Sequence, residues 1–446
     1  MSVEDTIFAL ASGATPAAIA VVRVSGRRAA AAYAALCGTA PAAPRRAQRV
    51  VLRDPANSEH LDEGLALWFP APASYTGEAV VEFQIHGGSA VTAGVTAALA
   101  AVDGVRPAEP GEFTRRAFEN GKVDLTAAEG VADLVAAETA MQRRQALGQM
   151  AGGLARIYDG WRVRLLRTLA HFEVEIDFPE EDLLNAMGET RRDEIAALAA
   201  EIHGHLADHR LGERLRAGLF VGIVGAPNVG KSSLLNLLAR RDAAIVSATA
   251  GTTRDVVEVH LDLAGYPVVL ADTAGLRAAG DAVEREGVRR AREWAARADV
   301  TLAVFDAGAW DPYDSATLGL VDDATLCVLN KMDLASLSAP PPNPPGHRAC
   351  RISVARNMGI DELLERLTTL LARRWGVKEA PALTRVRHRA ALITCLEALE
   401  RALAAPLLEL ATEDLRLAVR ALGRITGCVD VEDVLDVIFR DFCIGK

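Results

Sequence analysis

The segment that most constrains the fold of this chain has the spacing of a P-loop. It reads Gly225-Ala226-Pro227-Asn228-Val229-Gly230-Lys231-Ser232, between an apolar strand pattern at 219–224 and a helical pattern at 233–238. Glycines let backbone N–H groups turn toward phosphates, and a helix N-terminus adds the positive end of its dipole. We therefore expect Lys231 to pair with the β- and γ-phosphates of a nucleotide and Ser232 to bind Mg²⁺.

Two further motifs follow in the order that a GTP-binding domain requires. Asp272-Thr273-Ala274-Gly275 ends an apolar strand pattern at 268–271, where Asp272 can hold Mg²⁺ through water. Asn330-Lys331-Met332-Asp333 ends another at 326–329. A carboxylate at Asp333 would accept from N1–H and the amine of guanine, whereas adenine would leave it unpaired at a large cost. The sequence therefore predicts a GTP-binding domain built on a parallel sheet.

The switch and hydrolysis residues are less well defined. Gly251-Thr252-Thr253-Arg254-Asp255 stands where the first switch is expected, with Thr253 as the second Mg²⁺ ligand. Leu276 follows the Asp-x-x-Gly motif where many GTPases have a glutamine that orients water. Glu284 lies in the same segment and could orient the water instead, but Asp281 and Glu286 are close by and remain alternatives.

The rest of the chain divides into a mixed region and two helical ones. Residues 1–122 contain strand patterns at 19–24 and 79–85, and predict an α+β domain. Residues 123–212 and 378–446 carry apolar side chains at helical spacing, which we interpret as core packing, and Thr412 is expected to start a helix. Residues 217–377 alternate strand and helix. We therefore expect one discontinuous helical domain that is interrupted by the GTP-binding domain.

Composition and charge indicate where in the cell the chain is expected to act. The 446 residues are 50% hydrophobic with a formal net charge of −10, which argues against a surface covered with phosphate-binding cations. No apolar stretch reaches about 18 residues, so no membrane span is expected. The six cysteines include no Cys-x-x-Cys pair, and the first residues are acidic, unlike a signal peptide. A reducing cytoplasm is the expected location.

Several segments outside the nucleotide motifs also match a known family. They are Asp5-Thr6-Ile7, Tyr75-Thr76-Gly77-Glu78, Glu82, His86-Gly87-Gly88, Pro110-Gly111-Glu112-Phe113, Gly121-Lys122-Val123-Asp124-Leu125 and the closing Phe442-Cys443-Ile444-Gly445-Lys446. With these segments the full length of the chain resembles the MnmE (TrmE) family of tRNA-modification GTPases. The resemblance implies a multidomain α/β and α architecture, in which an N-terminal α+β folate-binding domain precedes the discontinuous helical domain and its inserted Ras-like P-loop G domain.

The resemblance assigns the N-terminal domain to tetrahydrofolate binding and homodimerisation. By motif position, a one-carbon tetrahydrofolate would contact Arg23, Glu82 and Lys122, with Lys446 nearby. Arginine and lysine suit the oxygens of the pterin and glutamate groups, and Glu82 can accept from a pterin amine. Cys443 belongs to the C-terminal signature. It is either an inert thiol or part of the modification site.

The resemblance also implies that K⁺ replaces an arginine finger beside the nucleotide. Asn228 would hold K⁺ with Ser247, Thr249 and Thr252, the last three chiefly through backbone oxygens, and Glu284 matches the catalytic acid of the family. Ser353-Val354-Ala355, the last nucleotide loop, departs from the commoner Ser-Ala-Lys. The residues expected to contact GTP are Asn228, Val229, Gly230, Lys231, Ser232, Ser233, Ser247, Ala248, Thr249, Ala250, Gly251, Thr252, Thr253, Asp272, Thr273, Ala274, Gly275, Asn330, Lys331, Asp333, Ser353, Val354 and Ala355.

The implied activity is a potassium-dependent GTPase that acts on tRNA. With an FAD-dependent partner of the MnmG (GidA) type, in a heterotetramer, it would add an aminomethyl or carboxymethylaminomethyl group at C5 of the wobble uridine. The partner would supply most of the charge that binds tRNA. Two other classes remain alternatives: a ribosome-assembly GTPase, which usually carries an added RNA-binding module, and a signalling switch that needs a separate activator.

Overall fold

The computed structural model describes most of the chain. The described residues are 5–41, 43–177, 185–208, 210–241, 244–245, 258–272, 297–309, 313–334, 342–344, 346–376, 381–429, 435, 438–440 and 442–445. They form two compact units, of which the first comprises residues 1–132, 149–199 and 394–446 and the second comprises 133–148 and 200–393. None of the described helices is long and apolar enough to cross a membrane.

The first unit contains a six-stranded sheet in the order β3-β4-β5-β2-β1-β6. Its neighbouring strands are antiparallel except for the pair β1 and β6. The strands are β1 (Thr6–Leu10), β2 (Ala17–Ser25), β3 (Gln48–Arg53), β4 (His60–Phe69), β5 (Val80–Gly87) and β6 (Val105–Pro107).

Alternate side chains of this sheet are buried under two helices, α1 (Ala29–Cys37) and α2 (Ser89–Ala100). Val22 and Val24 of β2 and Phe83 of β5 are fully buried in the same cluster as Tyr33 of α1 and Leu99 of α2. Because strand side chains alternate between the two faces, the intervening residues Arg23 and Glu82 lie on the opposite face. The sequence pattern of the two strands thus decides which of their residues face away from the core.

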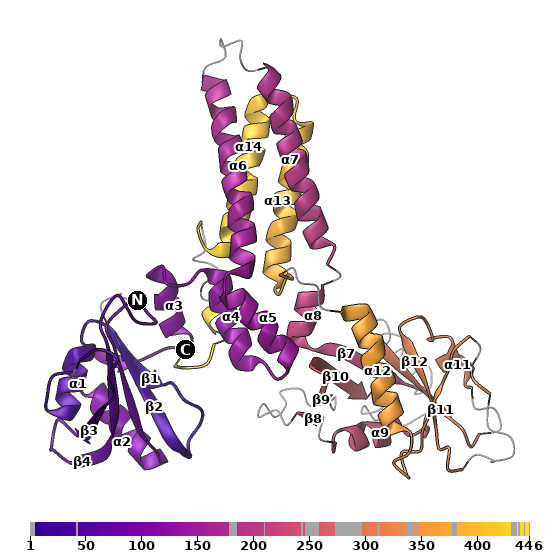
Figure 1. The fold of residues 1–446 in the computed structure, drawn as a ribbon, viewed down its shortest axis with the longest axis horizontal. Coiled ribbons are helices and arrows are strands. Elements are labelled where there is room, and N and C mark those ends of the chain that lie inside the picture. The colour runs from indigo at the N-terminus through magenta and orange to yellow at the C-terminus, as the bar shows by residue number, and fades with distance from the viewer. Residues whose placement is uncertain are drawn as a thin grey trace, which may run out of the picture. The chain divides into compact units, whose positions relative to one another are not determined.

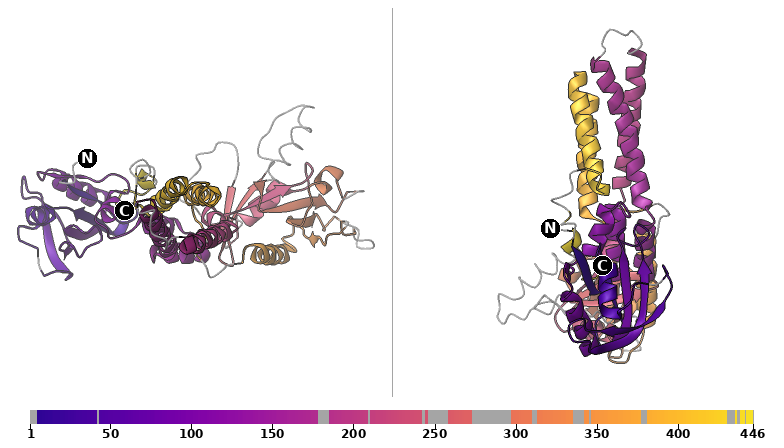
Figure 2. Two further views of the ribbon diagram at one scale, coloured as in Figure 1. Left: turned by 90° about the horizontal axis from the view of Figure 1, so that it is seen from above. Right: turned by 90° about the vertical axis from the view of Figure 1, so that its left-hand side faces the viewer.

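Four long helices, α6 (Gly153–Asp177), α7 (Asn185–Leu206), α13 (Val386–Ala404) and α14 (Leu408–Thr426), run side by side in Figures 1 and 2. Trp161, Leu165 and Phe172 of α6 are buried as their spacing predicts. The expectation that a helix starts at Thr412 is wrong, because α14 begins at Leu408 and the Thr412 hydroxyl donates to the Leu408 carbonyl at 2.8 Å.

Residues from the two ends of the sequence meet in the first unit. The first unit also contains α3 (Glu112–Glu119) and most of α4 (Leu125–Ala136). The end of α4 and most of α5 (Ala140–Met150) belong to the second unit. Leu125 shares a buried cluster with Phe439 and Phe442. A Cβ added to Gly445 would lie 2.3 Å from the Leu10 carbonyl oxygen, so the chain near its C-terminal end packs against β1.

The second unit is built on a seven-stranded sheet in the order β13-β12-β11-β7-β10-β9-β8. Its strands are β7 (Leu219–Val224), β8 (Ala244–Ile245), β9 (Glu258–Leu263), β10 (Tyr266–Asp272), β11 (Val300–Asp306), β12 (Thr325–Asn330) and β13 (Cys350–Arg351). The strands from β13 to β10 are parallel, and β9 is antiparallel to both of its neighbours. The described helices of this unit include α8 (Leu211–Ala217), α9 (Lys231–Leu238), α11 (Ser315–Leu318) and α12 (Ile360–Trp375).

Candidate functional site

The nucleotide motifs lie at one edge of the second sheet. β7 is flanked by β11 on one side and β10 on the other, so the chain reverses its direction of winding beside the segment that follows β7. The carboxyl ends of parallel strands meet at this edge, which is where open α/β sheets bind ligands. The edge therefore carries the P-loop after β7, Asp272 at the end of β10 and Asn330 at the end of β12.

The P-loop backbone needs its two glycines. Gly225 and Gly230 have φ values of +154° and +100°. A Cβ on Gly225 would lie 2.4 Å from the Val304 carbonyl oxygen, and one on Gly230 would lie 2.4 Å from Asn330 Nδ2. Lys231, the first residue of α9, is buried, and its Nζ donates to the carbonyl oxygens of Gly225 and Ala226 at 2.9 Å each. The glycine conformations and the two lysine bonds thus give this segment the compact turn that is typical of a P-loop.

Asn330 joins three nucleotide motifs. Its Nδ2 donates to the Val229 carbonyl at 2.8 Å, and its Oδ1 accepts from the Val354 N–H at 3.1 Å. The side chain is almost fully buried. Because both ends of the amide are used, Asn330 ties the P-loop and the 353–355 loop to the segment that was predicted to read the base.

Asp333 is held as an acceptor at the predicted guanine position. Its Oδ1 accepts from the Ser353 hydroxyl at 2.5 Å, and this bond lowers the pKa of the Asp333 carboxyl. Asp333 itself is exposed. An ionised carboxylate at this position can accept two parallel N–H donors from the edge of a guanine base.

Asp306 is a site residue that the sequence reasoning missed. Its Oδ2 accepts from Lys331 Nζ at 2.6 Å, and its Oδ1 accepts from the Gly308 N–H at 3.0 Å. Lys331 has a φ of +63°, an uncommon backbone conformation for a residue other than glycine. A signal for Asp306 was nevertheless present in the sequence. Asp306 is the last residue of a largely apolar strand, as Asp272 and Asn330 are the last residues of theirs.

Several predicted residues lie outside the described part of the chain. They are Ser247, Ala248, Thr249, Ala250, Gly251, Thr252, Thr253, Thr273, Ala274, Gly275, Glu284 and Lys446, and for Asp272 the description covers the backbone alone. Of the expected metal ligands, Ser232 lies exposed in the first turn of α9, and Asn228 lies in the P-loop with a φ of +62°. The Mg²⁺ and K⁺ ligand sets and the catalytic acid therefore stay predictions.

In the first unit, the structure brings Arg23 and Glu82 together. They are register partners on β2 and β5, and both Nε and Nη2 of Arg23 lie 2.9 Å from Glu82 Oε1. Lys122 is exposed, and its Nζ donates to the Pro72 carbonyl at 3.1 Å. Cys443 has an exposed side chain, and its carbonyl accepts from the Gly111 N–H at 3.5 Å.

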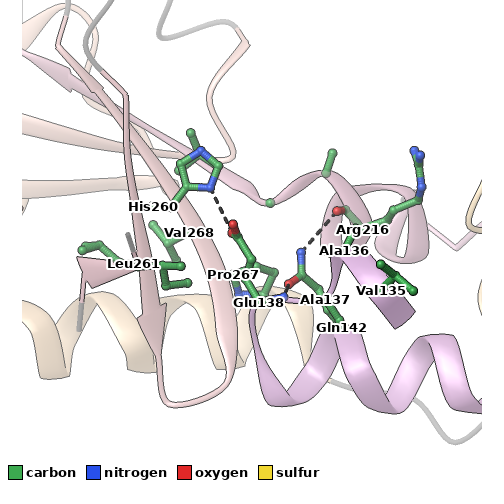
Figure 3. A pocket seen from close by; sticks show the side chains of 14 residues that line it. Val135, Ala136, Ala137, Glu138, Gln142, Arg216, His260, Leu261, Pro267 and Val268 are labelled. Atoms are coloured by element: carbon green, nitrogen blue, oxygen red, sulfur yellow. Dashed lines mark hydrogen bonds and ion pairs between the residues drawn. The ribbon is translucent and has the colours of Figure 1, made fainter. Parts of the chain in front are cut away.

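The second unit also contains a cavity of about 430 Å³, which is not the nucleotide site. It is lined at the amino ends of β7 and β10, by Gly218 and by Pro267 to Val269, and so lies at the sheet edge opposite the P-loop. In Figure 3 His260 of β9 points toward Glu138, and their Nδ1 and Oε2 atoms are 3.1 Å apart. Gln142 donates to the Arg216 carbonyl at 3.3 Å on the other side.

Comparison with known proteins covers nearly the whole chain. Residues 6–122 match the family described as the GTP-binding protein TrmE N-terminus, and residues 125–443 match the family described as the MnmE helical domain. The chain is 55% identical over 443 residues to the tRNA modification GTPase MnmE of Paramagnetospirillum magneticum, covering 99% of this chain and 100% of that protein. The chain belongs to the MnmE family.

Other relatives extend the similarity to an animal protein. The chain is 54% identical over 454 residues to the tRNA modification GTPase MnmE of Rhodospirillum rubrum, covering 99% of each. It is 47% identical over 476 residues to the mitochondrial 5-taurinomethyluridine-[tRNA] synthase subunit GTPB3 of Danio rerio, covering 99% of this chain and 93% of that protein. As a member of the MnmE family, whose relatives are named tRNA modification GTPases, the chain is a GTP hydrolase that acts in tRNA modification. The multidomain architecture expected from the sequence is confirmed.

Proposed function

We propose that this chain is a potassium-dependent GTPase that modifies the wobble uridine of tRNA at C5, together with an FAD-dependent partner of the MnmG type. A one-carbon tetrahydrofolate bound by the N-terminal domain would supply carbon for an aminomethyl or carboxymethylaminomethyl group. The observation that carries the proposal is the joining of three nucleotide motifs by Asn330, in a chain whose relatives are named for tRNA modification.

The GTPase part of the proposal assigns roles around the P-loop. Lys231 and the backbone N–H groups of the loop bind the phosphates, while the Ser232 hydroxyl would hold Mg²⁺ with Thr253. Asn228 in the loop, with Ser247, Thr249 and Thr252, would hold K⁺. A monovalent cation there would offset the charge that develops between the β- and γ-phosphates. Glu284 would orient the attacking water.

The K⁺ assignment has a direct test in the purified protein. GTP turnover in K⁺ should exceed turnover in Na⁺ by at least about tenfold, since removing one charge-stabilising group typically costs that much or more. Asn228→Ala should remove the difference between the two salts. Equal turnover of the unaltered protein in both salts would remove K⁺ from the mechanism and would favour a signalling switch that needs an activator.

The folate part is supported by the polar groups on the N-terminal sheet. Arg23 and Glu82 lie on the face that is not covered by α1 and α2, where they offer donors and an acceptor side by side. Glu82 Oε2 can accept from a pterin amine, while Lys122 is an exposed cation suited to a glutamate carboxylate. Lys446 is proposed to complete the site.

The tRNA and partner assignments rest on similarity and charge. The relative from Danio rerio is named as a subunit of a uridine-modifying synthase, which supports a shared active complex. A chain with a net charge of −10 gains affinity for tRNA when a partner supplies the cations. We propose a homodimer, formed through the N-terminal domain, that binds the MnmG-type protein in a heterotetramer in the cytoplasm.

The decisive experiment is nucleoside analysis of bulk tRNA by mass spectrometry after deletion of the gene. Loss of the C5-modified wobble uridine, with its return when the unaltered gene is restored, is the expected result. A gene carrying Asp333→Asn is the matched control, because it should not restore the nucleoside. Unchanged wobble uridines would reject the proposal, and a defect in ribosomal subunits instead would favour the assembly-factor alternative.

A further inference from the structure

Arg23 is enclosed by aromatic rings from two separate segments of the first unit. Its Cζ lies 5.7 Å from the ring centroid of Tyr75 and 5.7 Å from that of Phe113. Tyr75 belongs to the segment between β4 and β5, and Phe113 to the first turn of α3. We call these two residues the ring clamp. The guanidinium of Arg23 thus contacts both rings as well as Glu82. Because one ring is on α3 and the other is on the Tyr75 segment, the position of Arg23 depends on the distance between these two segments.

Two polar contacts join α3 to the Tyr75 segment. The hydroxyls of Tyr75 and Thr114 are 2.8 Å apart, with Thr114 fully buried on α3. Two residues further along α3, Arg116 Nη1 donates to the two carboxylate oxygens of Glu78 at 3.2 and 3.1 Å. Each segment therefore carries one half of the ring clamp and one half of an ion pair.

A second ion pair anchors α3 to the sheet. Glu112 accepts two bonds from Arg106 of β6, at 2.9 and 2.6 Å, and one from Arg116 Nη2 at 2.9 Å. Burial opposes ionisation of Glu112, but the bonds from Arg106, the Glu109 N–H and Arg116 outweigh it and lower its pKa. Arg116 also donates to the Asp5 carbonyl at 2.8 Å, next to β1.

The resulting network pairs each of its buried charges. Arg106 and Arg116 contact Glu78 and Glu112, and Arg106 Nε also lies 3.3 Å from Asp5 Oδ2. Both Glu112 and Arg116 are only 6% exposed. Buried ion pairs contribute little net stability, so their value lies in fixing one arrangement over others. Here the fixed arrangement is that of α3 against the segment that carries Tyr75.

The same segment also contacts the second cation expected at the folate site. Lys122 Nζ donates to the Pro72 carbonyl, and a Cβ on Gly77 would lie 3.3 Å from Lys122 Cγ. Asn120 Nδ2 donates to the Thr76 carbonyl at 2.8 Å. A shift of residues 72–78 would therefore move the surroundings of Arg23 and Lys122 together.

We propose that Glu112 and Arg116 are positioning residues of the folate site: they hold the ring clamp closed on Arg23 without touching the ligand. This inference rests on the proposed folate binding of the N-terminal domain. It predicts that tetrahydrofolate affinity depends on a buried ion-pair network whose members have no contact with the pterin.

The test measures binding of 5-formyl-tetrahydrofolate to the full chain by isothermal titration calorimetry. Arg116→Lys keeps the charge but loses the planar fork that reaches Glu78, Glu112 and Asp5 at once, so affinity should fall about tenfold or more. Glu78→Gln, at a less buried position, should weaken binding in the same direction. Glu119→Gln is the matched control, because Glu119 pairs with Arg115 at 3.0 Å on α3, outside the network.

A double-mutant cycle separates positioning from general destabilisation. In an Arg23→Ala background, Arg116→Lys should weaken folate binding little further, because the side chain that it positions is gone. GTP turnover and the thermal midpoint of the second unit should match the unaltered protein throughout. The positioning role would be overturned if both Arg116→Lys and Glu78→Gln bound folate as tightly as the unaltered chain. It would also be overturned if the losses of folate affinity in Arg116→Lys and Arg23→Ala were fully additive. Either outcome would leave the folate assignment in place. Lack of binding to the unaltered chain would instead refute the folate assignment itself, and the inference with it.

Discussion

Asn330 donates a hydrogen bond from Nδ2 to the Val229 carbonyl at 2.8 Å, so the segment expected to read guanine is fastened directly to the phosphate loop. Binding of the base and binding of the phosphates are thus coupled through one buried amide. We expect Asn330→Ala to weaken GTP and GDP together by about 1–3 kcal/mol, which is roughly 5- to 150-fold. Equilibrium titration with fluorescent GTP and GDP analogues measures this loss of affinity. A loss confined to GTP would contradict the coupling.

Asp333 should decide which base is bound. Asp333→Asn replaces a double acceptor with an amide that can donate, so guanosine triphosphate should lose at least about 100-fold in affinity. Xanthosine triphosphate has a carbonyl where guanine has its amine, and the Asn amide can donate to it. Competition between the two nucleotides for binding to Asp333→Asn measures this change of base preference. Because Ser353 also contacts Asp333, Ser353→Ala is the control, and it should weaken GTP without favouring xanthine.

Glu284→Ala should lower the rate of GTP hydrolysis by about 10²- to 10⁴-fold, the range found when a general acid or base is removed. GTP affinity should stay close to that of the unaltered chain, because the carboxylate is expected to act on the water and not on the nucleotide. Asp281→Ala and Glu286→Ala are the matched controls. If either of them abolished hydrolysis while Glu284→Ala did not, the catalytic role would pass to that residue.

The acid stability of the N-terminal domain should depend on Glu112. Its pKa is lowered in the folded protein, so its ionised form contributes stability above about pH 4.5, the ordinary value, and that contribution is lost as the pH falls through the lower folded value. The thermal midpoint should therefore fall more steeply below pH 4.5 in the unaltered protein than in Glu112→Gln. Parallel pH profiles of the two proteins would contradict this assignment.

The nucleotide motifs could be predicted from sequence because phosphate chemistry fixes their local spacing. Gly225, Gly230 and Lys231 belong to one short motif, and the strand before them is recognisable by its apolar run. Asp306 could not be assigned in this way. It reaches Lys331 only because β11 and β12 pair with Asp306 opposite Asn330, and such register is a property of the folded sheet.

The ring clamp of the N-terminal domain could not be predicted from sequence either. Arg23, Tyr75 and Phe113 are far apart in sequence, and no local pattern predicts that they meet. The wrong helix start at Thr412 has a different cause. Threonine is favoured before a first helical turn, yet inside a helix its hydroxyl can donate one turn back, as Thr412 does to Leu408.

The buried cluster of Leu125, Phe439 and Phe442 has a consequence for synthesis on the ribosome. Residues 200–393, which form most of the second unit, leave the ribosome before Phe439 does. The nucleotide-binding sheet can therefore be completed on a nascent chain whose N-terminal part still waits for its last packing partners. A ribosome stalled after the second unit would present a chain that binds GTP while Leu125 still lacks those partners.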